Sequence, residues 1–490
     1  MNHAQTIICG LAGFFVCWFS IHLILSRSIW FRALMAQRQF HQTHTTPIPR
    51  FGGVALAAAF VTVAVAALVL ITQGPSGIRE SVAIMVCSLA MFGLGFADDL
   101  RPLGAKIKLL GQIIIAGGVC LGGLEIAQLK NPFTNTVHQL GIFAVPVTIF
   151  WLVALTNLIN LVDGIDGLAG GIGFMMMCLL AYLGVHTQAS FTIVVAIGMA
   201  GALLGFLYFN FPPAKIYMGD GGAYLVGFLI GTLAISNSNK GTVAVALLAP
   251  TVALALPIID VALAIARRGV RGLPIFRPDK KHIHHRLAEL GLSPLKVVLI
   301  LYGLSFLFLV MGFLVFWSEG RMLPVFVGFA ALAVVVGIRM MGWIRNWLEV
   351  RHMVGGAGEM RRRVRYALAM SDWLDLGAEH AGTPDELWEN FAFGAQRLGF
   401  CRVLLRQGES ERSVTCANFA AEKFDLTDQH QINADVASFD LEFIGNSAVE
   451  EPKTFFLLSE LAAEAWLRAA RRWQRTHNRA IQFTPQPPAK

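Results

Sequence analysis

The stretch Val147-TIFWLVALTNLINLVDGIDGLAG-Gly171 joins an apolar run, residues 147–158, directly to a polar segment that contains several glycines. Apolar runs recur at residues 7–25, 54–71, 82–97 and 297–317. A helix of ~20 apolar residues crosses a bilayer, and most of these runs approach that length. With the shorter runs included, the pattern predicts about eleven membrane-spanning helices before residue 341, and so an all-α polytopic membrane protein.

Composition and charge also indicate a membrane protein. Of 490 residues, 55% are hydrophobic and 14% are charged, whereas roughly 25% of a soluble globular domain is charged. The net charge of +8 is distributed by loop, and an N-terminus outside the membrane places most Lys and Arg inside. The basic charge is therefore an orientation signal, and we expect no nucleic-acid partner. The expected location is therefore a membrane, with the basic loops on its cytoplasmic side.

After residue 341 the long apolar runs end and charged residues become frequent. We predict a transmembrane domain at residues 1–341, a basic, glycine-containing linker at 342–365, a cytoplasmic α/β domain at 366–480 and a disordered Pro-rich tail at 481–490. Within the α/β domain the pattern predicts helices at 384–398 and 454–473 and strands at 401–406, 413–418 and 439–443. Their order resembles a small GAF-like sensory domain. An odd number of spans after an outside N-terminus puts this domain in the cytoplasm.

Four polar clusters interrupt the apolar chain. The topology set by Lys and Arg alone brings all four to the cytoplasmic side, where carboxylates at helix ends usually mark function because their burial is costly. The spacing of three in the second cluster predicts that its polar side chains share one helical face. The clusters are Asp98 and Asp99 with Lys108; Asn157, Asn160, Asp163 and Asp166; Tyr217 and Asp220; and His282, His284, His285 and Arg286.

This combination of carboxylates with Lys, His and Arg suits a substrate that carries phosphates and a divalent cation. Mg²⁺ prefers carboxylate and phosphate oxygens and bridges phosphates in transfer reactions, and Mn²⁺ is the alternative ion. Phosphoryl transfer depends on positioning and charge neutralisation more than on a protein nucleophile. We therefore expect a phosphoryl-transfer site at the inner face of the membrane.

Several motifs occur in an order that resembles a known family over about residues 1–341. The motifs are His44-x-x-Pro47-x-Pro49-Arg50-x-Gly52-Gly53, Asp98-Asp99, the Asn160 to Gly167 segment, Tyr217-Met-Gly-Asp220 and His282-x-His284-His285. Together they are similar to the polyprenyl-phosphate N-acetylhexosamine-1-phosphate transferases, of the glycosyltransferase 4 type, whose relatives include phospho-N-acetylmuramoyl-pentapeptide transferase. The resemblance implies transfer of N-acetylhexosamine-1-phosphate from a UDP-sugar to undecaprenyl phosphate, with release of UMP, to initiate a cell-envelope glycan. The His282 segment looks more like the N-acetylhexosamine branch than the pentapeptide branch.

The same resemblance implies roles for individual residues. Asp220 would ligate Mg²⁺ together with Asp163, and Asp98 and Asp99 would place or deprotonate the lipid phosphate. Asp163 and Asp166, with Asn160, would hold the nucleotide and complete the catalytic site. The groups that neutralise the diphosphate would be Lys108, His282, His284 and His285, and the other substrate-binding candidates are His44, Arg50, Asn157, Tyr217 and Arg286.

Two segments depart from the family pattern. Met35-Ala-Gln-Arg38 stands near the place where the family often has an Asp-Arg/Lys-Pro-Asn segment. Gly221 stands where Ser or Thr commonly follows the metal-site Asp, which removes a polar contact near the expected metal. Neither departure affects the carboxylates of the four clusters.

Other interpretations stay open. Asp98 and Asp99 fit a solvated helix end, Asp220 fits a helix N-cap, and the His cluster fits a zinc site or a polar loop. The alternative functions are a pentapeptide-transferase-like activity, a secondary transporter, a CDP-alcohol phosphatidyltransferase and an inactive scaffold. Carboxylates at helix ends and the lack of a visible repeat argue against a transporter, and the D-G-x-x-A-R helix pair of the phosphatidyltransferases is missing. The sugar, the glycan pathway and a homodimer also stay open.

Overall fold

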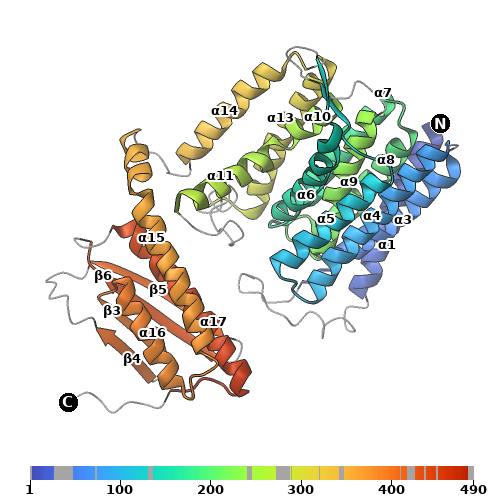
Figure 1. Ribbon diagram of the computed structural model, residues 1–490. Coiled ribbons are helices and arrows are strands. Elements are labelled where there is room, and N and C mark those ends of the chain that lie inside the picture. The colour runs from blue at the N-terminus through green and yellow to red at the C-terminus, as the bar shows by residue number, and fades with distance from the viewer. Residues whose placement is uncertain are drawn as a thin grey trace, which may run out of the picture. The chain divides into compact units, whose positions relative to one another are not determined.

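The chain divides into two compact units, here called the helical unit and the C-terminal unit (Figure 1). The helical unit comprises Met1–Ala264 and Pro278–Trp343, and the C-terminal unit comprises Ile265–Arg277 and Ile344–Lys490. The computed structural model describes residues 3–26, 48–71, 74–130, 136–239, 245–271, 287, 290–318, 320–340, 347–408, 410–415, 425–434, 437–447 and 451–483.

The helical unit consists mainly of long apolar helices. In chain order its elements are α1 (His3–Ser26), α3 (Gly52–Leu70), α4 (Pro75–Leu100), α5 (Ala105–Leu121), the antiparallel hairpin β1 (Gln128–Lys130) and β2 (Val137–Gln139), η1 (Gly141–Phe143), α6 (Ala144–Val162), α7 (Leu168–His186), α8 (Ser190–Asn210), α9 (Gly219–Asn239), α10 (Val245–Ala253), α11 (Ala255–Arg271), α13 (Pro294–Trp317) and α14 (Leu323–Met340). Helix α11 continues into the C-terminal unit, since the division between the units falls within it.

Eight of the described helices are long and apolar enough to cross a membrane: α1, α3, α4, α6, α7, α8, α9 and α13. The pair α10 and α11 passes the same test as one span that bends by 69°. A count of eleven also needs this bent pair, the 17-residue α5 and the short apolar helix α14. The expected polytopic helical architecture is therefore confirmed, and the number eleven stays a prediction.

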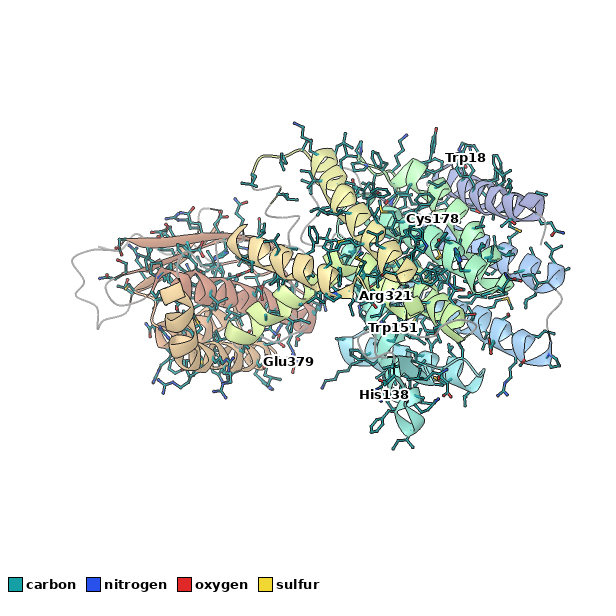
Figure 2. The ribbon with its side chains drawn as sticks, turned by 90° about the horizontal axis from the view of Figure 1, so that it is seen from above. Trp18, His138, Trp151, Cys178, Arg321 and Glu379 are labelled. Atoms are coloured by element: carbon teal, nitrogen blue, oxygen red, sulfur yellow. The ribbon has the colours of Figure 1, made fainter. Side chains whose placement is uncertain are left out.

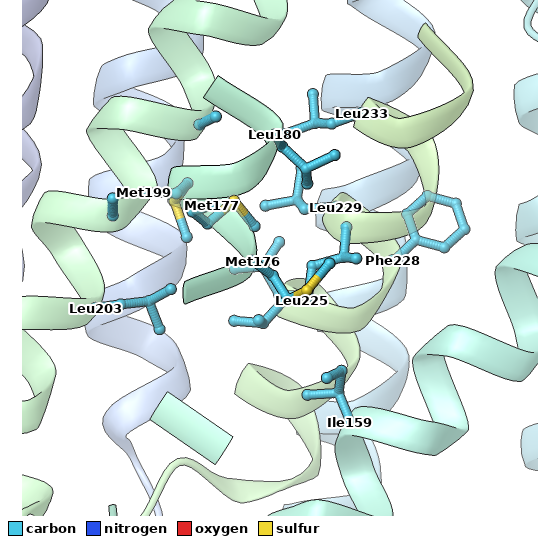
Figure 3. Packing of buried hydrophobic residues seen from close by; sticks show 14 of the residues in the cluster. Ile159, Met176, Met177, Leu180, Met199, Leu203, Leu225, Phe228, Leu229 and Leu233 are labelled. Carbon is cyan, nitrogen blue, oxygen red and sulfur yellow. The ribbon is translucent and has the colours of Figure 1, made fainter. Parts of the chain in front are cut away.

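Helix α9 is central to the packing of the helical unit. Its apolar side chains are almost all buried, and α3, α4, α6 and α7 lie against it. Figure 3 shows Leu225 and Leu229 of α9 packed beside Met176 and Leu180 of α7. This dry packing fixes the position of α9 along its axis, and with it the position of Asp220 in the first turn of the helix.

Glycines at the helix crossings allow the polar helix ends to meet. A Cβ atom at Gly95 of α4 would lie 2.5 Å from the carbonyl oxygen of Asp220, and one at Gly53 of α3 would lie 2.4 Å from the backbone nitrogen of Gly222. No side chain fits at such distances, so the backbones approach this closely only because both positions are glycine. The crossing brings the carboxylate end of α4 against the first turn of α9.

Trp151, seen in Figure 2, attaches α6 to the same central helix. Its indole Nε1 donates a hydrogen bond to the carbonyl oxygen of Gly231 at 3.2 Å. Trp151 is half-buried, and an indole N–H that faces other helices needs such a partner, because an unpaired donor inside a membrane helix bundle is costly. The polar end of α6 is thereby held at a fixed position relative to α9.

The C-terminal unit combines helices with a four-stranded antiparallel sheet. Its main elements are α15 (Trp347–Gly377), α16 (Pro384–Leu398), β3 (Arg402–Gln407), β4 (Ser410–Thr415), β5 (Leu426–Ala434), β6 (Ala437–Gly445) and α17 (Pro452–His477), and the strand order is β4-β3-β6-β5. Helix α16 lies against β3 and β4, α17 against β5 and β6, and α15 against both helices. The core of this unit surrounds the buried Trp466.

Local signals account for some of these elements and not for others. Helix α16 occupies the expected residues 384–398, because the Thr383 hydroxyl caps the amide of Glu386 and Gly399, with φ of 96°, ends the helix. Strand β5 was not predicted, since most of its side chains are polar and it forms by pairing with β6. Helix α15 covers 355–358, where the glycines predict a linker, because strong helix formers surround them.

Candidate active site

Lys108 links carboxylates from two different helices. It lies in the first turn of α5, and its ammonium group donates to Asp98 Oδ2 at 2.9 Å and to Asp220 Oδ2 at 3.4 Å. Asp98, near the end of α4, also accepts the backbone N–H of Leu103 at 2.6 Å. The side chains of Asp98 and Lys108 are 12% and 26% exposed, so the pair is accessible to a ligand yet partly shielded from water. The Lys108 ammonium group therefore lies between the end of α4 and the first turn of α9.

Asp99 caps helix α9 from the neighbouring helix α4. Its Oδ1 accepts the backbone N–H of Asp220 at 3.0 Å, and its Oδ2 accepts that of Gly221 at 2.9 Å. The first N–H groups of a helix have no partner inside the helix, and a carboxylate satisfies them well. Asp99, rather than Asp220 itself, thus holds the start of α9, and it does so beside the side chain of Asp220.

The segment between α6 and α7 is a turn and not a continuation of the helix. Helix α6 ends at Val162, and Gly167 has φ of 80°. Asp163 directly follows α6, and its N–H still donates to the carbonyl oxygen of Ile159 at 3.1 Å. The prediction that Asn157, Asn160, Asp163 and Asp166 share one helical face is therefore wrong for Asp166, because the chain leaves the helix after Val162 and turns at Gly164 before Asp166 is reached.

Two neighbours hold this turn in place. Asp166 Oδ2 accepts the backbone N–H of Ala214 at 3.0 Å. The buried side chain of Asn210, at the end of α8, accepts the amide of Gly167 at 2.9 Å and donates to the carbonyl oxygen of Ile216 at 2.7 Å. The turn and the loop before α9 are thereby fixed to each other.

Asn157 forms a reciprocal amide pair one turn deeper. Its Nδ2 donates to Gln112 Oε1 at 2.7 Å, and Gln112 Nε2 approaches Asn157 Oδ1 at 3.4 Å. Gln112 lies four residues after Lys108, on the same face of α5. The pair joins α5 to α6, so the contact that the structure shows for Asn157 stabilises the helix that carries Lys108.

The first motif reaches the site through its backbone. Gly52 and Gly53 donate their N–H groups to the carbonyl oxygens of Tyr217 and Met218, both at 2.9 Å, and Tyr217 donates its N–H to Pro49 at 2.8 Å. A Cβ atom at Gly52 would lie 2.6 Å from the Tyr217 carbonyl oxygen, so this close pairing requires glycine. The pairing brings Arg50 into electrostatic contact with Asp163.

The carboxylates interact strongly with one another. Burial, followed by the neighbouring charges of Asp220 and Asp99, raises the pKa of Asp163 well above its ordinary value, while Arg50 acts in the opposite direction. Burial and the Asp166 carboxylate likewise raise the pKa of the Tyr217 hydroxyl. A site with this excess of negative charge favours a bound cation.

The donor set suits a magnesium ion that also binds substrate. Within the described part of the chain, no three carboxylate, His or Cys side chains form a ready-made metal centre. Mg²⁺ commonly takes one or two carboxylates and completes its octahedron with waters and substrate phosphates. Asp163 and Asp220 fit this pattern, because in the described structure neither accepts a backbone N–H, whereas Asp98, Asp99 and Asp166 each do.

Some predicted site residues cannot be compared with the structure. His44, His282, His284, His285 and Arg286 lie outside the described residues. Asn160 is half-buried in the last turn of α6, one turn before Asp163. The described candidates nevertheless gather at the ends of α4, α5, α6 and α9.

Known proteins resemble this chain over most of their own length. The profile of glycosyl transferase family 4 matches residues 81–238. The chain is 35% identical, over 267 residues, to a probable undecaprenyl-phosphate N-acetylglucosaminyl 1-phosphate transferase of Bacillus subtilis, covering 54% of this chain and 73% of that protein. The chain belongs to glycosyl transferase family 4. As a member of this family with many apolar helices, it is a multi-pass membrane protein.

Two further relatives come from the two branches of family 4 that the motifs resemble. A decaprenyl-phosphate N-acetylglucosaminephosphotransferase of Mycobacterium leprae is 33% identical over 322 residues, which is 60% of this chain and 80% of the relative. A phospho-N-acetylmuramoyl-pentapeptide-transferase of Clostridium beijerinckii is 30% identical over 277 residues, which is 54% of this chain and 81% of the relative. The resemblance seen in the motifs is thus confirmed for both branches.

The sequence motifs missed two residues that shape this family 4 site. Gln112 was detectable only as a polar side chain four residues after Lys108 in an apolar helix. Nothing in the sequence around Tyr302 of α13 indicates a role in the site, yet its hydroxyl donates a hydrogen bond to the carbonyl oxygen of Gly167 at 2.6 Å. A Cβ atom at Gly171 would lie 2.2 Å from the Tyr302 ring, so the tyrosine reaches the turn only because residue 171 is glycine.

Tyr302→Phe should lower the kcat of this family 4 enzyme by about 2- to 10-fold, since a lost neutral hydrogen bond is worth about 0.5–1.5 kcal/mol. The substitution keeps the ring and releases one anchor of the turn that carries Asp163 and Asp166. Steady-state rates on purified protein would measure the effect. Tyr182→Phe is the matched control, because Tyr182 packs α7 against Phe313 of α13 through its ring, with the centroids 4.8 Å apart. Equal rates for both variants would contradict the prediction.

Proposed function

We propose that this chain transfers N-acetylglucosamine-1-phosphate from UDP-N-acetylglucosamine to undecaprenyl phosphate, as the first step of a cell-envelope glycan. The observation that carries the proposal is the convergence of Asp98, Lys108 and Asp220 from three helices, beside the Asp163 turn. Two of the three relatives described above are named for N-acetylglucosamine-phosphate transfer to a polyprenyl phosphate, and they are the more similar ones.

In the proposed reaction one P–O bond forms and another breaks. An oxygen of the lipid phosphate attacks the phosphorus that is linked to the sugar. The bond from that phosphorus to the bridging oxygen breaks, and UMP leaves with the electron pair. The chemistry requires alignment of the two phosphates and neutralisation of their charge, which a cluster of fixed charges supplies.

Different residues of the chain would have different roles in this reaction. Asp98 would accept the proton of the lipid phosphate or orient that phosphate, and Lys108 beside it would neutralise charge on the diphosphate. Asp163 and Asp220 would hold Mg²⁺, or Mn²⁺, which when bound neutralises the phosphate oxygens. The nucleotide side of the site would comprise Asn157, Asn160, Asp166 and Tyr217 together with Arg50.

The proposed orientation follows from the positive-inside rule. Eleven spans with the N-terminus outside would bring every described carboxylate of the site, and the C-terminal unit, to the cytoplasmic side of the bacterial inner membrane. UDP-sugars are made in the cytoplasm, so this orientation gives the site access to both substrates. A homodimer is compatible with this arrangement and is not required by it.

The proposal is tested by the identity of the released nucleotide. Purified full-length protein supplied with undecaprenyl phosphate, UDP-N-acetylglucosamine and Mg²⁺ should release UMP and form a lipid diphosphate sugar. Release of UDP would indicate ordinary glycosyl transfer and would overturn the proposal. UDP-N-acetylmuramoyl-pentapeptide is the competing donor in the same assay, and a higher kcat/KM for it would assign the chain to the other branch.

A further inference from the structure

Helix α15 of the C-terminal unit exposes an unusual face. Residues spaced by three and four along the helix place Arg362, Arg365, Tyr366, Trp373 and Leu376 on one stripe. The opposite side of the helix is buried in the core of the unit and carries Val364, Ala367, Ser371 and Leu374. The helix is thus apolar on its buried side and both basic and apolar on its exposed side.

The apolar part of the stripe is large. Tyr366, Trp373 and Leu376 are 43%, 44% and 59% exposed, and Phe393 of α16 adds a fourth exposed side chain at 49%. The rings of Trp373 and Phe393 lie 6.1 Å apart. Leu376 lies one turn after Trp373 and Tyr366 two turns before it, so the four side chains share one side of the unit. Of the five large hydrophobic side chains exposed in the described part of residues 347–483, only Phe456 lies outside this group. A group of exposed apolar side chains of this kind usually marks an interaction surface.

Arginines gather at the N-terminal end of the same stripe. Arg361, Arg362 and Arg365 are exposed, and Arg361 Nε donates to the carbonyl oxygen of Gly269 at 3.1 Å. That bond joins α15 to the end of α11. Two exposed acids, Asp372 and Glu379, lie beside the stripe, and both are paired. Asp372 lies 3.6 Å from Arg468 and Glu379 lies 2.6 Å from Arg472, so their charges are partly balanced.

We propose that this α15 face, defined by Arg362, Arg365, Tyr366, Trp373, Leu376 and Phe393, binds the surface of the membrane that holds the chain's own spans. Arginines bind anionic lipid phosphates, and Trp, Tyr, Phe and Leu insert at the headgroup level, which is the pattern of an interfacial helix. The proposal does not depend on the transferase reaction.

Charge and chain connectivity favour a bilayer over a second copy of the chain as the occupant. The α15 face has a basic end, which would repel the same basic end of a second copy and attract anionic lipid. The bent pair α10 and α11 reaches Ala266 as a candidate span, only three residues before Gly269. The apolar helix α14 ends at Met340, shortly before α15 begins at Trp347. In sequence, α15 therefore follows the apolar helix α14, and it contacts the end of α11, which belongs to the bent candidate span.

The test uses the full-length chain in lipid nanodiscs that contain phosphatidylglycerol with brominated acyl chains. Native cysteines are replaced by alanine, and an environment-sensitive fluorophore is attached to Leu376→Cys. The control is Ser413→Cys, an exposed residue of β4. We expect bromine to quench the probe at 376 several-fold more than the probe at 413. Arg362→Glu with Arg365→Glu should abolish this difference, and the melting temperature of the solubilised protein reports whether the variant is folded.

Four results would overturn the proposal. Equal quenching at 376 and 413 would mean that the α15 face stays in water. Quenching that survives both charge reversals in a folded variant, or that is equally strong in phosphatidylcholine nanodiscs, would remove the role of the arginines. A blue shift at 376 without bromine quenching, which grows with the number of chains per nanodisc, would show that a second copy covers the face.

Discussion

Asp220→Asn should remove nearly all transferase activity at every pH from 6 to 9, a loss on the order of 10²–10³-fold, which is typical when one electrostatic group of a transfer site is removed. The amide keeps the size of the side chain, and the backbone N–H of Asp220 still binds Asp99, so the start of α9 remains intact. What disappears is a negative oxygen that faces Lys108 and would bind Mg²⁺.

The dependence of activity on Mg²⁺ concentration shows whether Asp220 is a metal ligand or only a structural residue. For Asp220→Asn we expect the Mg²⁺ concentration that gives half-maximal activity to rise sharply, together with an unchanged melting temperature. Glu125→Gln makes the same chemical change in the loop after α5, beyond the other end of that helix, and should leave both quantities at the wild-type value. A variant Asp220→Asn with wild-type magnesium dependence would exclude Asp220 as a ligand.

Asp98→Asn should lose rate mainly at low pH, by about 10²–10⁴-fold where a general base is needed. The second pKa of a phosphate monoester is near 6, so at pH 6 much of the lipid phosphate still carries the proton that Asp98 would accept. At pH 9 the phosphate is already a dianion and needs no base. The ratio of wild-type to variant rate should therefore fall as the pH rises from 6 to 9.

The contacts of Asp98 show which bonds the asparagine variant keeps. An asparagine has one carbonyl oxygen, which can accept from Leu103 and keep the loop after α4 in place, whereas the ion pair with Lys108 is lost equally at every pH. If the rate ratio is the same at all pH values, Asp98 positions the lipid phosphate or the cation and is not a base. Rates measured for wild type, Asp98→Asn and Glu125→Gln across the pH range decide between the two roles.

Local sequence information established the class of the protein. Apolar runs fix which segments are membrane helices, because the cost of burying a polar group in lipid depends on each short segment by itself. The ordered motifs identified the family, and Thr383, Pro384 and Gly399 defined α16 through capping, which also acts over a single turn. Even within the helical unit, however, the glycine turn after Val162 was mistaken for helix.

The roles inside the site depended on which helices meet. Asp99 caps α9 although 121 residues separate it from Asp220, and Tyr302 holds Gly167 from 135 residues away. Neither hydrogen bond can be predicted from the spacing of neighbouring residues in the sequence. These bonds form because glycines such as Gly95 and Gly171 let particular helices approach closely, and the positions of two helices relative to each other follow only from the packing of the whole bundle.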